Sequence, residues 1–177
     1  NTQFVLITVA DTGVGIPDSF KELAWQRFQR YEDHALQLDV AGTGLGLRMK
    51  VLAYDPFLSD DRATHMGVTK VELNELLARS DFITLHVPLT DKTRNILSKQ
   101  AIAATKKGVR IINCARGGLI DETALAEALK SGHVAGAALD VFAEEPATAS
   151  PLFGMPNVVV TPHLGASTTE AQENVAL

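Results

Sequence analysis

Short apolar runs rich in β-branched residues alternate with helical stretches over most of this chain. The runs predict buried strands at residues 49–55, 82–88, 109–115, 134–142 and 157–163. Helical patterns lie between several of them, at residues 71–79, 99–105 and 122–130. Strands that alternate with helices imply parallel βαβ connections, so the sequence predicts an α/β fold with a doubly wound, Rossmann-like parallel sheet.

Composition narrows the classes of partner and compartment. The chain has 177 residues, of which 46% are hydrophobic and 21% charged, with a net charge of -5. We expect no nucleic-acid partner, because no basic stripe could neutralise phosphates. We expect no membrane span, because no apolar run approaches about 20 residues, and no secretion signal. The single cysteine, Cys114, fits a reducing cytoplasm, and its apolar surroundings predict a core-filling role.

The stretch GTGLGLRMKVLAYDP at residues 42–56 resembles the front of a dinucleotide site, but its spacing argues against that role. A phosphate-binding glycine loop needs a strand before it and a helix that opens on it. A parallel crossover takes about 10–12 residues or more. Only Leu47 and Arg48 separate Gly46 from the next predicted strand, so no helix fits there.

Two resemblances meet near Arg48. The motifs VLAYDP, INCARGG, ALDVFAEEP and TPHLGAST lie within residues 49–177, which resemble the NAD-binding domain of the D-2-hydroxyacid dehydrogenase family, in particular its phosphoglycerate dehydrogenase branch. The motifs DTGVGIP, FQRY and GTGLGL lie within residues 1–47, which resemble the ATP-binding domain of sensor histidine kinases. We therefore predict a histidine-kinase-like fragment at residues 1–48 joined to an incomplete NAD-binding domain at residues 49–177, together forming one compact unit.

Three residues could support dehydrogenation of a 2-hydroxy acid. His163 can accept the hydroxyl proton, and Glu145 can bind the other ring nitrogen and fix the tautomer. Arg116 can bind the substrate carboxylate through its planar guanidinium. Taken singly, each residue fits a structural role better than a catalytic one. Taken together, they match the catalytic Arg, Glu and His that the dehydrogenase resemblance implies.

The resemblance also implies a set of cofactor-binding residues. Asp55 ends its strand where a carboxylate accepts the ribose hydroxyls of NAD and repels the extra phosphate of NADP, although a simple turn at Asp55 and Pro56 is an alternative. The implied NAD-binding residues are Asp55, Pro56, Val87, Pro88, Cys114, Ala115, Arg116, Asp140, His163, Gly165 and Ala166. Within this set Cys114, Ala115 and Asp140 are expected to face the nicotinamide amide. No metal site is predicted.

The kinase resemblance implies a second nucleotide, ATP. Asp11 would contact the adenine amino group, and a set of glycines would shape the lid over the triphosphate: Gly13, Gly15, Gly42, Gly44 and Gly46. Turn formation is the alternative role for these glycines, because the magnesium-binding helix of that family is missing.

The dehydrogenase-like part lacks its family's first βα unit, which would normally fill the centre of the sheet. We predict that residues 4–10 replace that strand, with Gly13 and Gly15 where the phosphate loop would lie. Asp18 stands where a third glycine belongs, so we expect weakened cofactor binding.

Three functions remain open at this point. The first is NAD-dependent oxidation of a small D-2-hydroxy acid, most like 3-phosphoglycerate, a phosphorylated acid of serine biosynthesis. The second is an ATP-binding remnant of a sensor histidine kinase. The third is a fusion fragment without catalytic activity. The dehydrogenase resemblance also implies assembly into a homo-oligomer.

Overall fold

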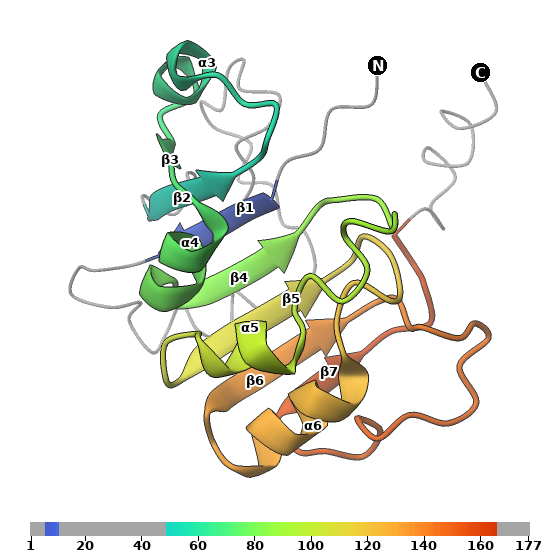
Figure 1. Cartoon of the computed structure of the whole chain (residues 1–177). Coiled ribbons are helices and arrows are strands. Elements are labelled where there is room, and N and C mark those ends of the chain that lie inside the picture. Colours follow the sequence, from blue (N-terminus) through green and yellow to red (C-terminus); the bar gives the residue numbers. More distant parts are fainter. Residues whose placement is uncertain (1–5, 11–48, 166–177) are drawn as a thin grey trace, which may run out of the picture.

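The computed structural model describes residues 6–10 and 49–165 of the chain. Their helices and strands follow in the order β1 (Leu6–Ala10), β2 (Lys50–Tyr54), α3 (Asp60–His65), β3 (Thr69–Lys70), α4 (Leu73–Arg79), β4 (Phe82–Leu85), α5 (Lys99–Ala103), β5 (Val109–Asn113), α6 (Glu122–Lys130), β6 (Val134–Leu139) and β7 (Val158–Val160). Figure 1 shows α4, α5 and α6 lying along one face of a single twisted sheet.

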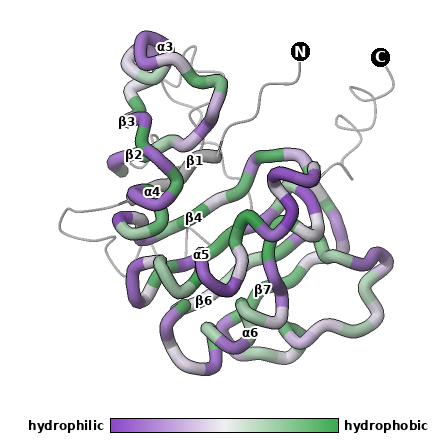
Figure 2. The backbone as a smooth tube through the Cα atoms, in the orientation of Figure 1, coloured by the Kyte–Doolittle hydropathy of each residue, from purple (hydrophilic) through white to green (hydrophobic). Residues whose placement is uncertain are grey.

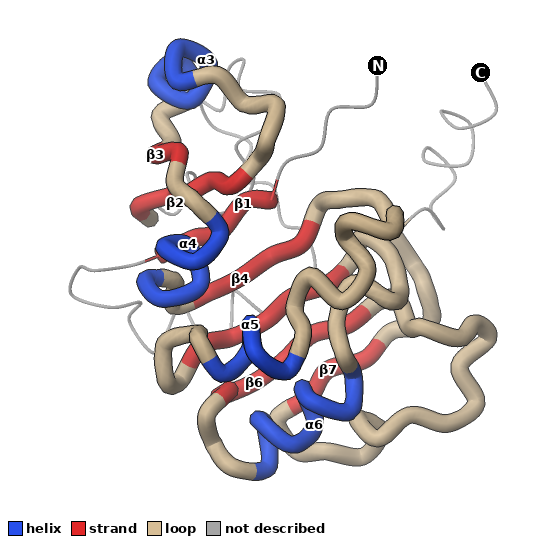
Figure 3. The backbone as a smooth tube through the Cα atoms, in the orientation of Figure 1, coloured by secondary structure: helices blue, strands red, loops and turns tan. Residues whose placement is uncertain are grey.

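The strands form one sheet in the order β3-β2-β1-β4-β5-β6-β7 (Figure 3). Four neighbouring pairs are parallel, namely β2 with β3, β4 with β5, β5 with β6, and β6 with β7. Parallel strands joined by helical crossovers, with the first strand in the middle, are the features of a Rossmann-like sheet. The predicted α/β fold class is therefore confirmed.

Strand β1 fills the central position that we predicted for it, but it runs in the opposite direction to its neighbours. It is antiparallel to β2, with Leu6 opposite Tyr54 and Ala10 opposite Lys50, and antiparallel to β4. The prediction of a sheet parallel throughout is wrong at this strand. Either direction can pair the backbone amides of β2 and β4, so the missing strand can be replaced by one of opposite sense.

The direction of β1 bears on the phosphate loop. Ala10, its last residue, lies beside Lys50, the first residue of β2, so β1 ends at the edge opposite to the carboxyl ends of the parallel strands. A phosphate loop at Gly13 and Gly15 required a parallel β1, so the predicted place of that loop is not supported. The two glycines themselves lie outside the described residues.

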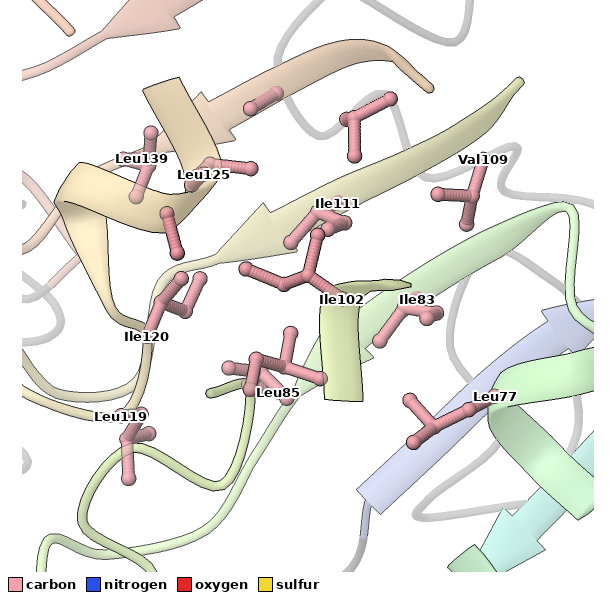
Figure 4. Close-up of a cluster of buried hydrophobic side chains, with 14 of the residues drawn as sticks. Leu77, Ile83, Leu85, Ile102, Val109, Ile111, Leu119, Ile120, Leu125 and Leu139 are labelled. Carbon is pink, nitrogen blue, oxygen red and sulfur yellow. The ribbon is translucent and has the colours of Figure 1, made fainter. Parts of the chain in front are cut away.

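The larger hydrophobic core lies between the helices α4, α5 and α6 and the strands β4–β6, and Leu52 of β2 also belongs to it. Leu77, Ile102 and Leu125 project from the three helices toward strand residues that include Ile83 and Ile111, as Figure 4 shows. Side chains alternate along β5, where Val109 and Ile111 are buried on the helical side and their neighbours are less so. This alternation is typical of a strand with one face against a helical layer.

A smaller hydrophobic cluster lies beside β2, α3 and β3. Its buried members are Val51, Ala53, Leu58, Ala63 and Val68. Figure 2 shows why few helical residues join it, since the tube through α3 is mostly hydrophilic while that through β4 is largely hydrophobic. Strand β2 therefore has this small cluster on one face, while Leu52 on its other face belongs to the large core.

Helix α6 has the bounds that the sequence predicted, and its sequence explains them. The Asp121 carboxylate caps the helix by accepting a hydrogen bond of 3.0 Å from the amide of Ala124. Leu125 and Leu129 lie on its buried face, and Gly132 follows it with a φ of 72°. Helix α3 and strand β3 were not predicted. A capping signal for α3 does exist, because the Ser59 hydroxyl accepts a hydrogen bond from Arg62.

Candidate functional site

The polar residues that the sequence singled out gather at one edge of the sheet. Since β2, β4, β5, β6 and β7 share one direction, their carboxyl ends meet at the same edge. The structure brings to this edge most of the predicted residues: Asp55 after β2, Val87 and Pro88 after β4, Cys114, Ala115 and Arg116 after β5, Asp140 after β6, and His163 and Gly165 after β7. Ala166 lies outside the described residues, as do Asp11, Gly13, Gly15, Gly42, Gly44 and Gly46.

His163 and Glu145 form a close pair at this edge. Nδ1 of His163 lies 2.6 Å from Oε2 of Glu145, and the two side chains are 47% and 35% exposed. The hydrogen bond to His163, together with one from the Phe142 amide, holds the pKa of Glu145 below its usual value. An ionised Glu145 can only accept, so Nδ1 of His163 carries the proton and Nε2 is the basic nitrogen of the neutral ring.

Glu145 is itself held in place by the backbone. Its other oxygen, Oε1, accepts a hydrogen bond of 3.0 Å from the amide of Phe142. The carboxylate is therefore fixed between a backbone donor on one side and the imidazole on the other. Such a pairing is what the sequence predicted for the two residues, and it restricts the rotation of the His163 ring.

The loop that carries Arg116 is organised by a buried asparagine that the sequence reasoning missed. Asn113, the last residue of β5, is 2% exposed. Its amide nitrogen donates to the carbonyl of Arg116 at 2.9 Å, and its side-chain oxygen accepts from the amide of Ala115 at 3.1 Å. The exposed Arg116 guanidinium donates to the Ala115 carbonyl. A polar residue at the end of an apolar strand was the available signal.

Gly117 brings the Arg116 loop against the segment that carries Glu145. A Cβ atom at Gly117 would lie 1.6 Å from the carbonyl oxygen of Phe142. No side chain fits in that space, so only glycine allows the two backbones to approach so closely. Arg116 and the Glu145–His163 pair are thus linked through one backbone contact, although they come from different crossovers.

Asp140 holds the loop that presents His163. Its Oδ1 accepts from the Thr161 hydroxyl and from the Leu164 amide at 2.7 Å, and its Oδ2 accepts from the Gly165 amide at 2.8 Å. Burial alone would raise the pKa of Asp140, but these three hydrogen bonds outweigh it and keep the pKa below its usual value. His163 lies within this loop with a φ of 55°, a conformation that needs such support.

Asp55 directly follows β2 and is buried, with 5% exposure. Its Oδ1 accepts a hydrogen bond of 2.8 Å from the amide of Phe57, so the residue forms the turn that was the alternative interpretation. Turn formation and cofactor binding are compatible, because one carboxylate has further acceptor positions. The neighbouring Pro56 and Phe57 are exposed.

Two other predicted residues have surroundings that the sequence did not indicate. Cys114 is exposed at the end of β5, so its predicted core-filling role is wrong. Although the residue is exposed, its thiol is partly desolvated. This desolvation, together with the nearby Asp140 charge, raises the pKa of the thiol. Val87, in contrast, belongs to the large hydrophobic core, while Pro88 is half-buried.

The groups along this edge are of the kinds that a dinucleotide site uses. A carboxylate, apolar side chains and a guanidinium follow one another along this edge of the sheet. NAD requires such an order, because it has a ribose at one end and a nicotinamide at the other. Within residues 6–10 and 49–165, no strand is followed at this edge by a GxGxxG loop that opens a helix for the pyrophosphate. The adenosine and nicotinamide ends therefore fit NAD better than its middle does.

Metal sites and membrane-spanning helices are both absent from the described residues. In the described part of the chain, no group of three or more His, Cys, Asp and Glu side chains is placed to hold a metal ion. None of the helices within those same residues combines the length and apolarity that crossing a bilayer requires.

Comparisons with known proteins agree with this geometry. Residues 38–165 match the family described as D-isomer specific 2-hydroxyacid dehydrogenase, NAD binding domain. This match includes Gly42, Gly44 and Gly46 and crosses the predicted junction at Arg48. The assignment of residues 1–48 to a separate kinase-like fragment stays a prediction.

Two curated relatives are D-3-phosphoglycerate dehydrogenases. The protein from Bacillus subtilis is 55% identical over 138 residues, which cover 78% of this chain and 26% of that protein. The protein from Synechocystis is 46% identical over 177 aligned residues, covering 92% of this chain and 32% of that protein. The chain thus spans about a third or less of the length of these relatives.

Solved structures place the fold in the same family. A glyoxylate reductase from Paecilomyes thermophila matches with a TM-score of 0.70 and 36% identity, covering 75% of this chain and 40% of that one. A D-lactate dehydrogenase from Treponema pallidum matches with a TM-score of 0.67 and 34% identity, covering 73% of this chain and 43% of that one. Together with the match over residues 38–165, this shows that the chain belongs to the D-isomer specific 2-hydroxyacid dehydrogenase family through its NAD-binding domain.

Proposed function

We propose that the chain binds NAD along the carboxyl edge of the sheet and supplies the residues that oxidise a D-2-hydroxy acid. The observation that carries this proposal is the Glu145–His163 pair, with Nδ1 of the ring 2.6 Å from the carboxylate. The close approach of Gly117 to Phe142 supports it, because it joins the Arg116 loop to the same region. A carboxylate-oriented imidazole and a guanidinium that lie at the same edge of the sheet suit an α-hydroxy carboxylate substrate.

The proposed roles follow from the chemistry of each group. Nε2 of His163 accepts the proton of the substrate hydroxyl, and the charge that develops on the ring is stabilised by Glu145. Arg116 binds the substrate carboxylate and orients the carbon that loses hydride. When bound, NAD supplies the acceptor for that hydride. Asp55 binds the ribose hydroxyls and disfavours a 2′-phosphate.

The names of the relatives support a finer proposal for the substrate, 3-phosphoglycerate. Both curated relatives described above are D-3-phosphoglycerate dehydrogenases, and one is 55% identical to this chain where they align. A further D-isomer specific 2-hydroxyacid dehydrogenase, from Xanthobacter autotrophicus, has been solved in complex with NADPH. The choice between NADH and NADPH therefore needs its own measurement here.

A binding titration tests the cofactor proposal. Nicotinamide fluorescence should show saturable binding of NADH, and weaker binding of NADPH because Asp55 repels the extra phosphate. Asp55→Ala should weaken NADH binding by about tenfold, equivalent to about 1.4 kcal/mol. It should also reduce the difference in affinity between NADH and NADPH. Thr64→Ala on α3, which is exposed and away from the edge, is a matched control. Absence of NADH binding would contradict the proposal.

A turnover assay tests the catalytic part separately. We expect NADH formation from NAD and 3-phosphoglycerate, lost in His163→Ala while NADH binding persists. Binding without turnover would contradict the catalytic proposal and leave the binding proposal intact.

Two other expectations need separate measurements. A titration with ATP tests the kinase-like prediction for residues 1–48. Sedimentation analysis tests the expected homo-oligomer.

A further inference from the structure

Glu122, the first residue of α6, binds a segment that lies far along the chain. Its Oε1 accepts a hydrogen bond of 2.8 Å from the amide of Ala143, and its Oε2 accepts one of 2.9 Å from the hydroxyl of Ser150. Both oxygens of the carboxylate are thus engaged by the loop between β6 and β7. Neither the sequence motifs nor the proposed chemistry assigns a role to this residue.

The bond from Ala143 lies next to the bond that holds Glu145. The amides of Phe142 and Ala143 are adjacent in the chain, and they donate to Glu145 and Glu122 respectively. Glu145 in turn lies against Nδ1 of His163. A short chain of hydrogen bonds therefore runs from the start of α6, through two successive peptide groups, to the imidazole.

Helix capping does not explain the position of Glu122. The cap of α6 is Asp121, whose carboxylate accepts from the amide of Ala124 at 3.0 Å. A negative charge in the first turn favours the helix wherever it points, because of the helix dipole. The specific direction of the Glu122 side chain, away from its own helix, therefore indicates a second role.

Helix α6 is a suitable anchor for such a role. Leu125 and Leu129 bury it in the large core, with 0% and 4% exposure. The loop that it holds contains no helix or strand between β6 and β7. Without an external tie, the peptide groups of Phe142 and Ala143 would be held mainly by Glu145 and by the contact with Gly117.

We propose that Glu122 is a positioning residue that fixes the Phe142–Ala143 peptide and, through it, the geometry of the Glu145–His163 pair. The catalytic meaning of this positioning rests on the proposed function, in which His163 is the base. The geometry itself does not, and it can be measured without cofactor or substrate. Asp140, which follows β6, interacts electrostatically with both members of the pair.

Nuclear magnetic resonance of the full chain tests the proposal. The observables are the Nδ1 proton resonance of His163 and the carboxyl titration of Glu145. Glu122→Ala should weaken or abolish the Nδ1 proton signal and move the Glu145 pKa upward toward its ordinary value. Glu122→Gln should preserve both, since its amide oxygen can accept from Ala143 and its amide nitrogen can donate to Ser150.

Two further variants separate positioning from general stability. Asp121→Ala removes the cap of the same helix and should lower the unfolding midpoint without moving either resonance. Glu122→Asp keeps the charge but shortens the side chain, so it should behave like Glu122→Ala even if the alanine variant folds poorly. Glu145→Ala, which leaves no acceptor for Nδ1, provides the reference for complete loss of the pair.

The proposal is overturned if Glu122→Ala and Glu122→Asp leave both resonances unchanged, or if Asp121→Ala moves them equally. Failure of NADH binding or turnover, with the resonance shifts as expected, would instead count against the proposed function alone. The two sets of measurements therefore fail independently.

Discussion

The two halves of the sheet each end in a buried aspartate, but the two carboxylates are held very differently. Asp140 after β6 accepts hydrogen bonds from Thr161, Leu164 and Gly165, which lie more than 20 residues along the chain. In the described part of the chain, Asp55 after β2 accepts one hydrogen bond, from Phe57 two residues away. One carboxylate connects distant segments, while the other forms a local turn.

The hydrophobic cores differ in the same direction. The β4–β7 half is covered by α4, α5 and α6, and it carries Arg116, Glu145 and His163. The β1–β3 half contributes Leu52 to the large core and otherwise has the small cluster around Val51 and Ala53, and its backbone is hydrogen-bonded to β4 through the antiparallel β1. The acid–base residues are therefore supported by their own half, whereas the proposed cofactor residue Asp55 depends on pairing with a strand from the start of the chain.

The largest expected effect comes from truncating the two cores. Ile111→Ala, at a residue with 0% exposure, should lower the free energy of unfolding by about 2–5 kcal/mol. Val51→Ala, at 5% exposure in the small cluster, should cost about 1–2 kcal/mol. Urea denaturation measures both. Equal losses would contradict the contrast between the two halves.

The next effect comes from the two aspartates. Asp140→Ala leaves three donors of the His163 loop without their acceptor, so we expect a loss of about 3 kcal/mol at neutral pH. Asp55→Ala should cost about 1 kcal/mol, because one local bond is lost. The pKa of Asp140 is lowered in the folded state, so its contribution is present above about pH 4 and is lost as the pH falls through the folded pKa. Urea midpoints at pH 7 and pH 3 check the sign.

Replacing one glycine in each half by alanine tests how tightly the backbone is packed there. Gly117→Ala places a Cβ against the Phe142 carbonyl and should cost about 2–3 kcal/mol, since backbone must shift. Gly67→Ala, between α3 and β3, meets open space but keeps a φ of 68°, so it should cost about 1 kcal/mol. Thermal unfolding measures the difference. A harmless Gly117→Ala would show that the Arg116 loop does not need its close contact with Phe142.

The smallest effect is expected from surface charge pairs. Glu145→Gln should destabilise the fold by less than about 1 kcal/mol at pH 6, because the partly exposed pair is screened by solvent. The lowered pKa of Glu145 means that this difference is present above about pH 4.3 and disappears as the pH falls through the folded pKa. Asp60→Asn removes the exposed Asp60–Lys70 pair and should have less effect still. Urea midpoints from pH 6 to pH 3 separate the two pairs.

Local pattern was sufficient to predict most elements of the β4–β7 half. Helix α6 has a cap at Asp121, an apolar face and a terminal glycine, so its bounds could be predicted to the residue. The predicted strand at residues 109–115 is two residues too long, because β5 ends at Asn113. There the Asn113 side chain forms hydrogen bonds with the following turn, and these replace the hydrogen bonds between strands. Helix α3 was missed since its sequence is almost wholly polar and offers no periodic apolar face.

Candidate site residues were predicted from motif and resemblance, but their supports were not. Nothing in the spacing of Asn113, Glu122 and Thr161 indicates which backbone or side-chain groups they bind, since their partners lie on other crossovers or on turns that only the fold defines. Cys114 was expected in the core because its neighbours are apolar, yet it is exposed at the point where the strand ends.

By itself, the sequence determined the alternation of strands and helices, because periodicity is a property of neighbouring residues. This alternation also determined the edge of the sheet at which the candidate residues meet, namely Asp55, Arg116, Asp140 and His163. Tertiary structure alone decided the direction of β1 and the contacts that hold the His163 loop. Both depend on which groups the assembled sheet leaves unpaired, and a backbone amide accepts any partner of suitable geometry, whatever its place in the chain.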